Sequence, residues 1–89
     1  MSGARPLRIL YFAWLRERVG TAEEEVAVPE GVATVAGLIA WMQTRGPGFA
    51  AGFGATKTIR CAVNQSFCGP EAAVAPGDEV AFFPPVTGG

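Results

Sequence analysis

One segment of the chain has the hydrophobic spacing of an α-helix, whereas the apolar runs around it have the spacing of strands. After Thr34, apolar residues recur at the interval that puts side chains on one helical face: Val35, Leu38, Ile39 and Met42. Thr34 is a favourable N-cap, because its hydroxyl can accept a hydrogen bond from a backbone N–H of the first turn. Gly46 and Pro47 are expected to end the helix. The chain therefore has one long helix with which to cover a sheet.

The other apolar segments are rich in β-branched and aromatic residues, which is typical of strands. Five strands are predicted, at residues 7–14, 25–28, 58–63, 66–68 and 79–83. The first two are expected to pair as a hairpin, with a short helical turn after the first strand. Residues 46–56 are expected to form a loop with at most one helical turn. The predicted order is β-β-α-β-β-β, and its simplest arrangement is an α+β fold with one helix across one face of a mixed sheet.

The third and fourth predicted strands are separated by only two residues, Asn64 and Gln65. A two-residue hairpin at this point would place Cys61 directly opposite Cys68. Two interpretations remain open, a cross-strand disulfide or two unreacted thiols. A reducing compartment and the usual burial of free cysteine favour two inert thiols.

The pattern along the strands also predicts an apolar surface on the sheet. Successive side chains of a strand point to opposite faces. If the helix covers one face, four large apolar side chains are expected on the other: Leu10, Phe12, Phe67 and Phe83. An exposed group of this kind usually marks a site for a protein partner. Alternatively, the loop at residues 46–56 could cover Phe12 and Phe83.

The composition argues against several functional classes. The 89 residues carry a net charge of -1, which gives no basic face for nucleic acid. The sequence contains no histidine, which argues against a metal site and against independent catalysis. No apolar run is long enough to cross a membrane or has the flanks of a signal peptide, so we expect a soluble cytoplasmic protein. The acidic run at residues 23–25 is expected to be a solvated face.

The last eight residues pass from an apolar strand end, through Pro84 and Pro85, to Gly88 and Gly89. Two prolines should stop the strand and send the chain away in an extended path. We therefore divide the chain into a folded domain, residues 1–83, and a tail, residues 84–89. Because glycine lets another backbone approach closely, such a tail can enter a narrow channel and present the α-carboxylate of Gly89 as the reacting group.

The order of elements resembles that of the ubiquitin-like β-grasp family. Three segments, residues 10–20, 62–65 and 77–89, are similar to those of the small subunit of molybdopterin synthase, the MoaD family of sulfur carriers. The long ending is the most specific of the three, because a diglycine alone is shared by ubiquitin and by several bacterial sulfur carriers.

The resemblance implies a non-catalytic subunit whose terminus is the substrate of other proteins. A MoeB-type enzyme would use ATP and Mg²⁺ to adenylate the carboxylate of Gly89, and sulfur would then replace one oxygen to give a thiocarboxylate. A MoaE-type large subunit would receive the tail and transfer its sulfur to cyclic pyranopterin monophosphate. The family forms a heterotetramer, and no cofactor is expected on this chain itself.

The resemblance also assigns residues to the partner contacts. The exposed hydrophobic contacts of the family fall on Phe12, Phe67 and Phe83, and Arg16 lies where the family carries an arginine that helps to hold the activating enzyme. The tail residues expected in the partner's channel are Pro84, Pro85, Val86, Thr87 and Gly88. Three alternatives remain: a sulfur carrier for thiamin thiazole synthesis, a ubiquitin-like protein modifier, and a binding adaptor with no chemistry at the terminus.

Overall fold

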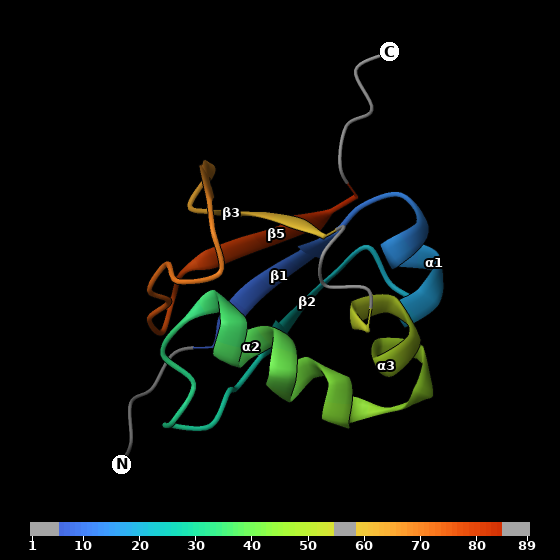
Figure 1. Ribbon diagram of the computed structural model, residues 1–89, viewed down its shortest axis with the longest axis horizontal. Helices are drawn as coiled ribbons and strands as arrows, with labels where there is room; N and C mark the ends of the chain where they lie inside the picture. The colour runs from blue at the N-terminus through green and yellow to red at the C-terminus, as the bar shows by residue number, and fades with distance from the viewer. Residues whose placement is uncertain (1–5, 55–58, 85–89) are drawn as a thin grey trace.

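A computed structural model describes residues 6–54 and 59–84, in which a layer of helices packs against a five-stranded sheet (Figure 1). The strands are β1 (Leu7–Tyr11), β2 (Glu23–Val26), β3 (Arg60–Val63), β4 (Ser66–Cys68) and β5 (Glu79–Phe83). The helices are α1 (Trp14–Val19), α2 (Val35–Met42), a 3₁₀ turn (Gln43–Arg45) and α3 (Pro47–Phe53). The predicted α+β fold with a mixed five-stranded sheet is confirmed.

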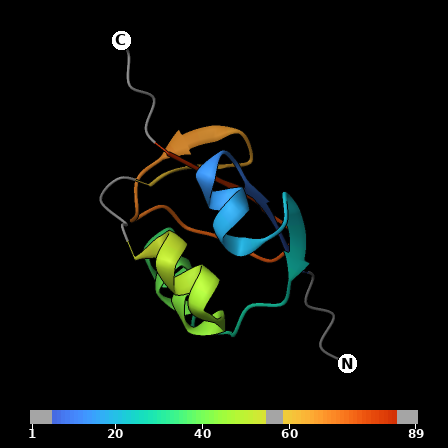
Figure 2. The ribbon, with the colours of Figure 1, turned by 90° about the vertical axis from the view of Figure 1, so that its right-hand side faces the viewer.

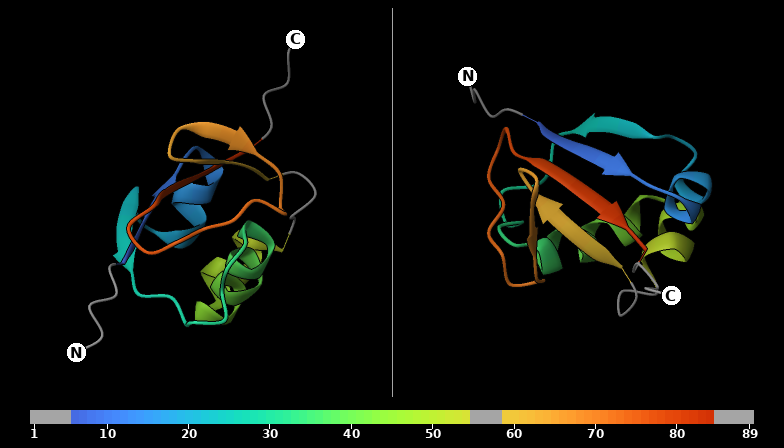
Figure 3. Two further views of the ribbon diagram at one scale, coloured as in Figure 1. Left: turned by 90° about the vertical axis from the view of Figure 1, so that its left-hand side faces the viewer. Right: turned by 90° about the horizontal axis from the view of Figure 1, so that it is seen from above.

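The sheet has the strand order β2-β1-β5-β3-β4, and the right-hand view of Figure 3 looks onto its strands. The central strands β1 and β5 are parallel, and the other three pairs are antiparallel. This places the first and last strands of the chain side by side at the centre of the sheet. The end of β5, where the tail leaves, therefore lies at the same edge of the sheet as the end of β1.

The first two strands differ in extent from the prediction. The first strand ends at Tyr11 rather than at residue 14, because Ala13 adopts φ 56° and Trp14 begins α1. Helix α1, which forms where a short helical turn was predicted, ends at Gly20 with this glycine in the left-handed conformation. The second strand is Glu23–Val26, two residues earlier than predicted, and it pairs with β1 as expected.

Helix α2 forms where the spacing of its apolar residues predicts it. The Oγ1 of Thr34 accepts a hydrogen bond from the backbone N–H of Gly37 at 3.1 Å, so Thr34 is the N-cap. The four residues of the predicted apolar face are all buried in the core: Val35, Leu38, Ile39 and Met42. The sequence alone was sufficient for the start and the apolar face, because both are local signals. The end differs, since α2 stops at Met42 and a 3₁₀ turn continues the chain to Gly46.

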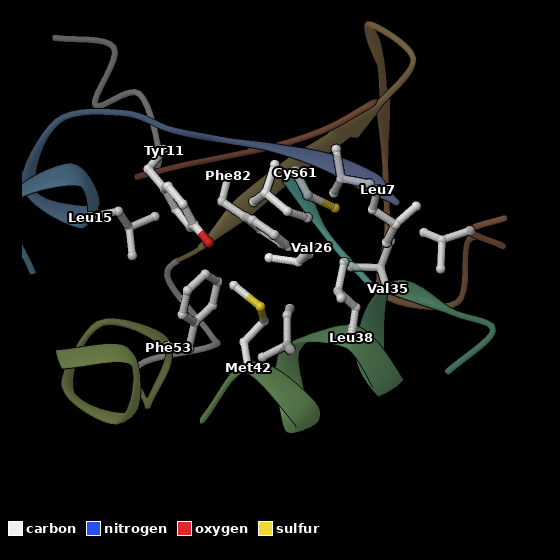
Figure 4. Close-up of a cluster of buried hydrophobic side chains, with 14 residues drawn as sticks. Leu7, Tyr11, Leu15, Val26, Val35, Leu38, Met42, Phe53, Cys61 and Phe82 are labelled. Atoms are coloured by element: carbon white, nitrogen blue, oxygen red, sulfur yellow. The ribbon is translucent and has the colours of Figure 1, made fainter. Parts of the chain in front are cut away.

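The prediction of a loop at residues 46–56 is wrong, since α3 occupies Pro47–Phe53. Pro47 begins this helix, a position where its fixed φ and missing N–H cost nothing. Phe53 is completely buried, with its ring centroid 4.9 Å from that of Phe82 and 6.2 Å from that of Tyr11. Figure 4 shows the Phe53 ring beneath these side chains of the sheet. Packing on the sheet, rather than helix propensity, therefore explains α3.

The acidic run of β2 is also less uniform than predicted. Glu23 and Glu25 are exposed, but Glu24 is opposite Ile9 and points toward the helices. Its Oε2 accepts hydrogen bonds from the hydroxyl of Tyr11 at 2.6 Å and from Nη1 of Arg45 at 2.8 Å. Burial raises the pKa of the Glu24 carboxyl, but the hydrogen bonds from Arg45 and Tyr11 outweigh it, so the pKa is lowered overall. Glu24 thus joins β2 to the 3₁₀ turn of the helix layer.

Two glycines inside helices are expected to respond in opposite ways to substitution by alanine. Helices α1 and α3 lie close together (Figure 2), and a Cβ at Gly48 would overlap the backbone carbonyl oxygen of Arg18. A Cβ at Gly37 would meet only ordinary contact, 3.5 Å from Oγ1 of Thr34. We expect Gly48→Ala to lower the free energy of unfolding by about 1–3 kcal/mol. Gly37→Ala is expected to raise it by about 0.5–1 kcal/mol, because alanine favours a helix interior.

Urea unfolding of the two variants beside the parent chain measures both changes. The Gly37→Ala variant is the control for the effect of alanine on helix propensity. A Gly48→Ala variant as stable as the parent would show that α1 and α3 do not approach this closely.

Candidate docking surface and tail

Three phenylalanines gather on the face of the sheet opposite the helices, and we call them the phenylalanine patch: Phe12, Phe67 and Phe83. The rings of Phe67 and Phe83 have centroids 5.7 Å apart. The backbone N–H of Phe12 donates to the carbonyl of Phe82 at 3.1 Å, so the chain after β1 still follows β5 at this point. Phe12 is 48% exposed and Phe67 is 85% exposed, while Phe83 is half-buried.

Two alanines and a leucine lie beside the patch on the same face. In the register of the ladder, Ala62 of β3 lies between Phe67 of β4 and Ala81 of β5. Leu10 lies beside Ala81 and is half-buried, rather than fully exposed. Two alanines therefore separate Phe67 from Leu10 across the sheet, which leaves a shallow surface that a broad partner can contact.

The alternative that residues 46–56 cover Phe12 and Phe83 is wrong for the part of this segment that the structure describes. Helix α3 packs on the opposite face, where Phe53 contacts Tyr11 and Phe82. Alternation along β1 and β5 directs Phe12 and Phe83 away from those two buried neighbours. The surface that strand alternation predicts is therefore present, with Phe12 and Phe67 as its most exposed members.

One exposed arginine borders the patch within the sheet, and another is close to it in the sequence. Arg16 is exposed on α1, which begins two residues after Phe12. Arg60 of β3 is also exposed and is opposite Phe83 in the ladder, a position that the sequence reasoning did not single out. The signal for Arg60 was available, because alternation along β3 places it on the same face as Ala62. A hollow of about 330 Å³ is lined by Arg60, Phe67, Phe83 and the two cysteines.

The predictions for the tail fall almost entirely outside the described residues. Strand β5 ends at Phe83 as predicted, and Pro84 follows it. The remaining tail residues, Pro85, Val86, Thr87, Gly88 and Gly89, lie beyond the described range, so the division of the chain after residue 83 stays a prediction. What the structure places is the starting point of the tail, next to the phenylalanine patch.

The predicted hairpin register is confirmed. Asn64 and Gln65 form a two-residue turn with φ of 51° and 71°, and Cys61 is opposite Cys68. Both cysteines are free thiols, as the sequence favoured. Within residues 6–54 and 59–84, no group of three or more histidine, cysteine, aspartate or glutamate residues is arranged to hold a metal ion. In that same part of the chain, no helix is long and apolar enough to cross a membrane.

The mixed sheet, its strand order and the helices on a single face define a ubiquitin-like β-grasp protein. The crystal structure of SAMP1 from Haloferax volcanii superposes with a TM-score of 0.69 at 28% identity, over 93% of this chain and 98% of that chain. A family model described as the ThiS family matches residues 9–89.

Two relatives have the same description, "molybdopterin synthase sulfur carrier subunit". The one from Escherichia coli K12 is 41% identical over 83 residues, covering 93% of this chain and 99% of the relative. The one from Haemophilus influenzae is 36% identical, with the same coverage. The chain belongs to the ThiS family, and within it to the group of molybdopterin synthase sulfur carrier subunits.

Proposed function

We propose that this chain is the sulfur carrier subunit of a molybdopterin synthase and that the carboxyl carbon of Gly89 carries the sulfur. The observation that supports this most strongly is the 41% identity with such a subunit over 99% of its length. The phenylalanine patch supports it independently, because it lies where β5 gives way to the tail. A partner that binds the patch would also receive Gly89.

The chemistry needs groups that other proteins supply. A carboxylate is a poor electrophile until one of its oxygens becomes part of a good leaving group. In the proposal, a MoeB-type enzyme with ATP and Mg²⁺ joins the Gly89 carboxylate to the α-phosphate of ATP, and pyrophosphate leaves. A sulfur donor then displaces AMP from the carboxyl carbon and leaves a thiocarboxylate. This chain has no histidine for the proton transfers. Its own role in the proposal is to bind the partner proteins and to position the Gly89 carboxylate in their active sites.

The docking step uses the open face of the sheet. In the proposal, a MoaE-type large subunit packs on the phenylalanine patch while the tail from Pro84 onward extends into its active site. There the sulfur passes to cyclic pyranopterin monophosphate, and two such deliveries complete the dithiolene. Arg16, exposed on α1, would form an ion pair with the activating enzyme.

Phe67→Asp is expected to weaken binding to a MoaE-type large subunit by at least about 30-fold, because loss of an aromatic hot-spot residue from an interface costs about 2 kcal/mol or more. Folding should be unaffected, since Phe67 is 85% exposed. Titration calorimetry with the purified large subunit measures the change in Kd.

Ala51→Asp on α3 is the matched control, because it adds the same charge at an exposed position of the opposite layer. It should leave the Kd within about threefold of the parent value, as expected for a residue outside the interface. Equal loss of affinity in both variants would mean that the patch is not the docking surface.

A second function, protein modification, is suggested by the similarity to SAMP1, which is named a small archaeal modifier protein. The two functions differ in the nucleophile that attacks the activated Gly89. A modifier would form an isopeptide bond with a lysine amine, whereas a carrier would take up sulfur and release it to a pterin. Reconstitution with large subunit and cyclic pyranopterin monophosphate distinguishes them, because only the carrier yields molybdopterin.

A further inference from the structure

The two cysteines of the β3–β4 hairpin are in contact across the strand pair. Cys61 and Cys68 are direct partners in the ladder, and their sulfur atoms are 3.3 Å apart. Opposite residues of an antiparallel ladder have Cα atoms about 4.5–5.5 Å apart, which is within the range of about 4.4–6.8 Å that a disulfide spans. The sulfurs need to approach by about 1.3 Å to reach the bond length of about 2.0 Å.

The two thiols differ in their access to solvent. Cys61 is 6% exposed, and burial together with its hydrogen bond to Cys68 raises the pKa of its thiol to about 12. Cys68 is half-buried. Both cysteines line a groove of about 510 Å³ between α2 and the β3–β4 hairpin, together with Val35, Ile39 and Gly69 among others. A small oxidant therefore has a path to this pair through the groove, and Cys68 is the sulfur it reaches more readily.

We propose that Cys61 and Cys68 form a reversible disulfide on exposure to hydrogen peroxide, and that this bond clamps the edge strand β4 to β3. The argument rests on the register, the sulfur–sulfur contact and the groove, and it holds whether or not the chain is a sulfur carrier. The free thiols of the structure are the reduced form of this site.

The proposed reaction has two steps. Cys68 loses its thiol proton to water, and the thiolate attacks one oxygen of peroxide; an S–O bond forms and the O–O bond breaks, giving a sulfenic acid. The second oxygen leaves as hydroxide and takes up the released proton to become water. The Cys61 sulfur then attacks the Cys68 sulfur; the S–S bond forms, the S–O bond breaks, and the thiol proton of Cys61 leaves with the hydroxyl as water. Two electrons pass from the two thiols to one peroxide, which is reduced to two waters.

The proposed disulfide would stabilise strand β4, which makes few other contacts with the sheet. Strand β4 has three residues and forms one edge of the sheet, paired only with β3 among the described strands. It carries Phe67, which points to the face opposite the sulfurs because it is the neighbour of Cys68 in the strand. The disulfide is therefore expected to fix the hairpin without covering the phenylalanine patch.

The test is peroxide treatment of the purified chain, followed by digestion and mass spectrometry without reduction. We expect the peptides that contain Cys61 and Cys68 to be linked within one chain, and the link to be reversed by dithiothreitol. The oxidised chain should unfold at a temperature higher by on the order of 10 °C, as closing a short loop predicts. The Kd for a MoaE-type large subunit, measured on both forms, should change less than about threefold, because Phe67 stays exposed.

Two variants identify the attacking thiol. In Cys61→Ala, Cys68 has no partner and should accumulate as a sulfenic acid that dimedone labels. In Cys68→Ala, the buried Cys61 should remain unlabelled. The proposal is overturned if wild-type chains yield no internal link, if links form only between chains, or if the oxidised chain is no more stable than the reduced one. The test of the internal link and of its effect on stability uses the wild-type chain, so it does not depend on the folding of either variant.

Discussion

Deletion of Gly89 is expected to reduce molybdopterin formation by at least about 100-fold, the largest functional effect that we predict. The deletion makes Gly88 the last residue and shortens the reach of the tail by about 3.5 Å. Misplacement of a reacting group by as little as about 1 Å can cost about 100-fold in rate. The measurement is the amount of molybdopterin formed from cyclic pyranopterin monophosphate with the activating enzyme and the large subunit.

The deleted chain should keep its stability and its docking surface, because the core and the phenylalanine patch lie within residues 6–54 and 59–84. Thermal unfolding and binding to the large subunit are therefore the controls. Molybdopterin formation near the parent rate by a chain that lacks Gly89 would contradict the proposed mechanism.

The largest expected effect on stability is that of Phe53→Ala. Phe53 is completely buried between α3 and the sheet, where its ring contacts Phe82 edge to face. Truncation of such a phenylalanine lowers the free energy of unfolding by about 3–5 kcal/mol. This is a large share of the total free energy of unfolding of a small domain, about 5–15 kcal/mol. Urea unfolding of the variant measures the loss.

Phe67→Ala is the matched control for this experiment, since it removes the same ring from a site that is 85% exposed. Its free energy of unfolding should stay within about 0.5 kcal/mol of the parent value. If Phe53→Ala costs no more than Phe67→Ala, helix α3 does not pack on the sheet as described.

Local signals explain which elements the sequence predicted well. The turn at Asn64 and Gln65 and the alternation on both sides of it determined the register of Cys61 with Cys68. The face of α2 was visible in the spacing of its apolar residues, and its start in the capping residue Thr34. In each case the residues that decide the structure are within a few positions of one another.

Helix α3 was not predicted and strand β2 was placed two residues late, because both depend on distant partners. Helix α3 is rich in glycine and alanine, and what fixes it is the contact of Phe53 with Tyr11 and Phe82 on the sheet. Strand β2 begins with an acidic run, for which the sequence predicts solvent exposure. In the structure, however, Glu24 binds Arg45, which is 21 positions away. Spacing along the chain could not reveal either partner.

The candidate site, like the fold, was predicted where local patterns determine it and missed where distant residues do. Alternation along the strands was enough to place Phe12, Phe67 and Phe83 on one face, because the period of a strand is short and regular. Alternation along β3 could have placed Arg60 on this face as well, but its position opposite Phe83 follows from the pairing of β3 with β5, which the sequence did not predict. The role of the tail rests on family similarity and on chemical argument, since residues 85–89 lie outside the described range.

The most direct test of the central claim is the intact mass of the chain after incubation with a MoeB-type activating enzyme, ATP, Mg²⁺ and a sulfur donor. We predict a mass increase equal to the replacement of one oxygen by one sulfur, and fragmentation that places the change on Gly89. Omission of ATP should prevent the increase. An unchanged mass with the active enzyme present, or sulfur located on Cys61 or Cys68 instead of Gly89, would contradict the proposal that this chain carries sulfur at its C-terminal glycine.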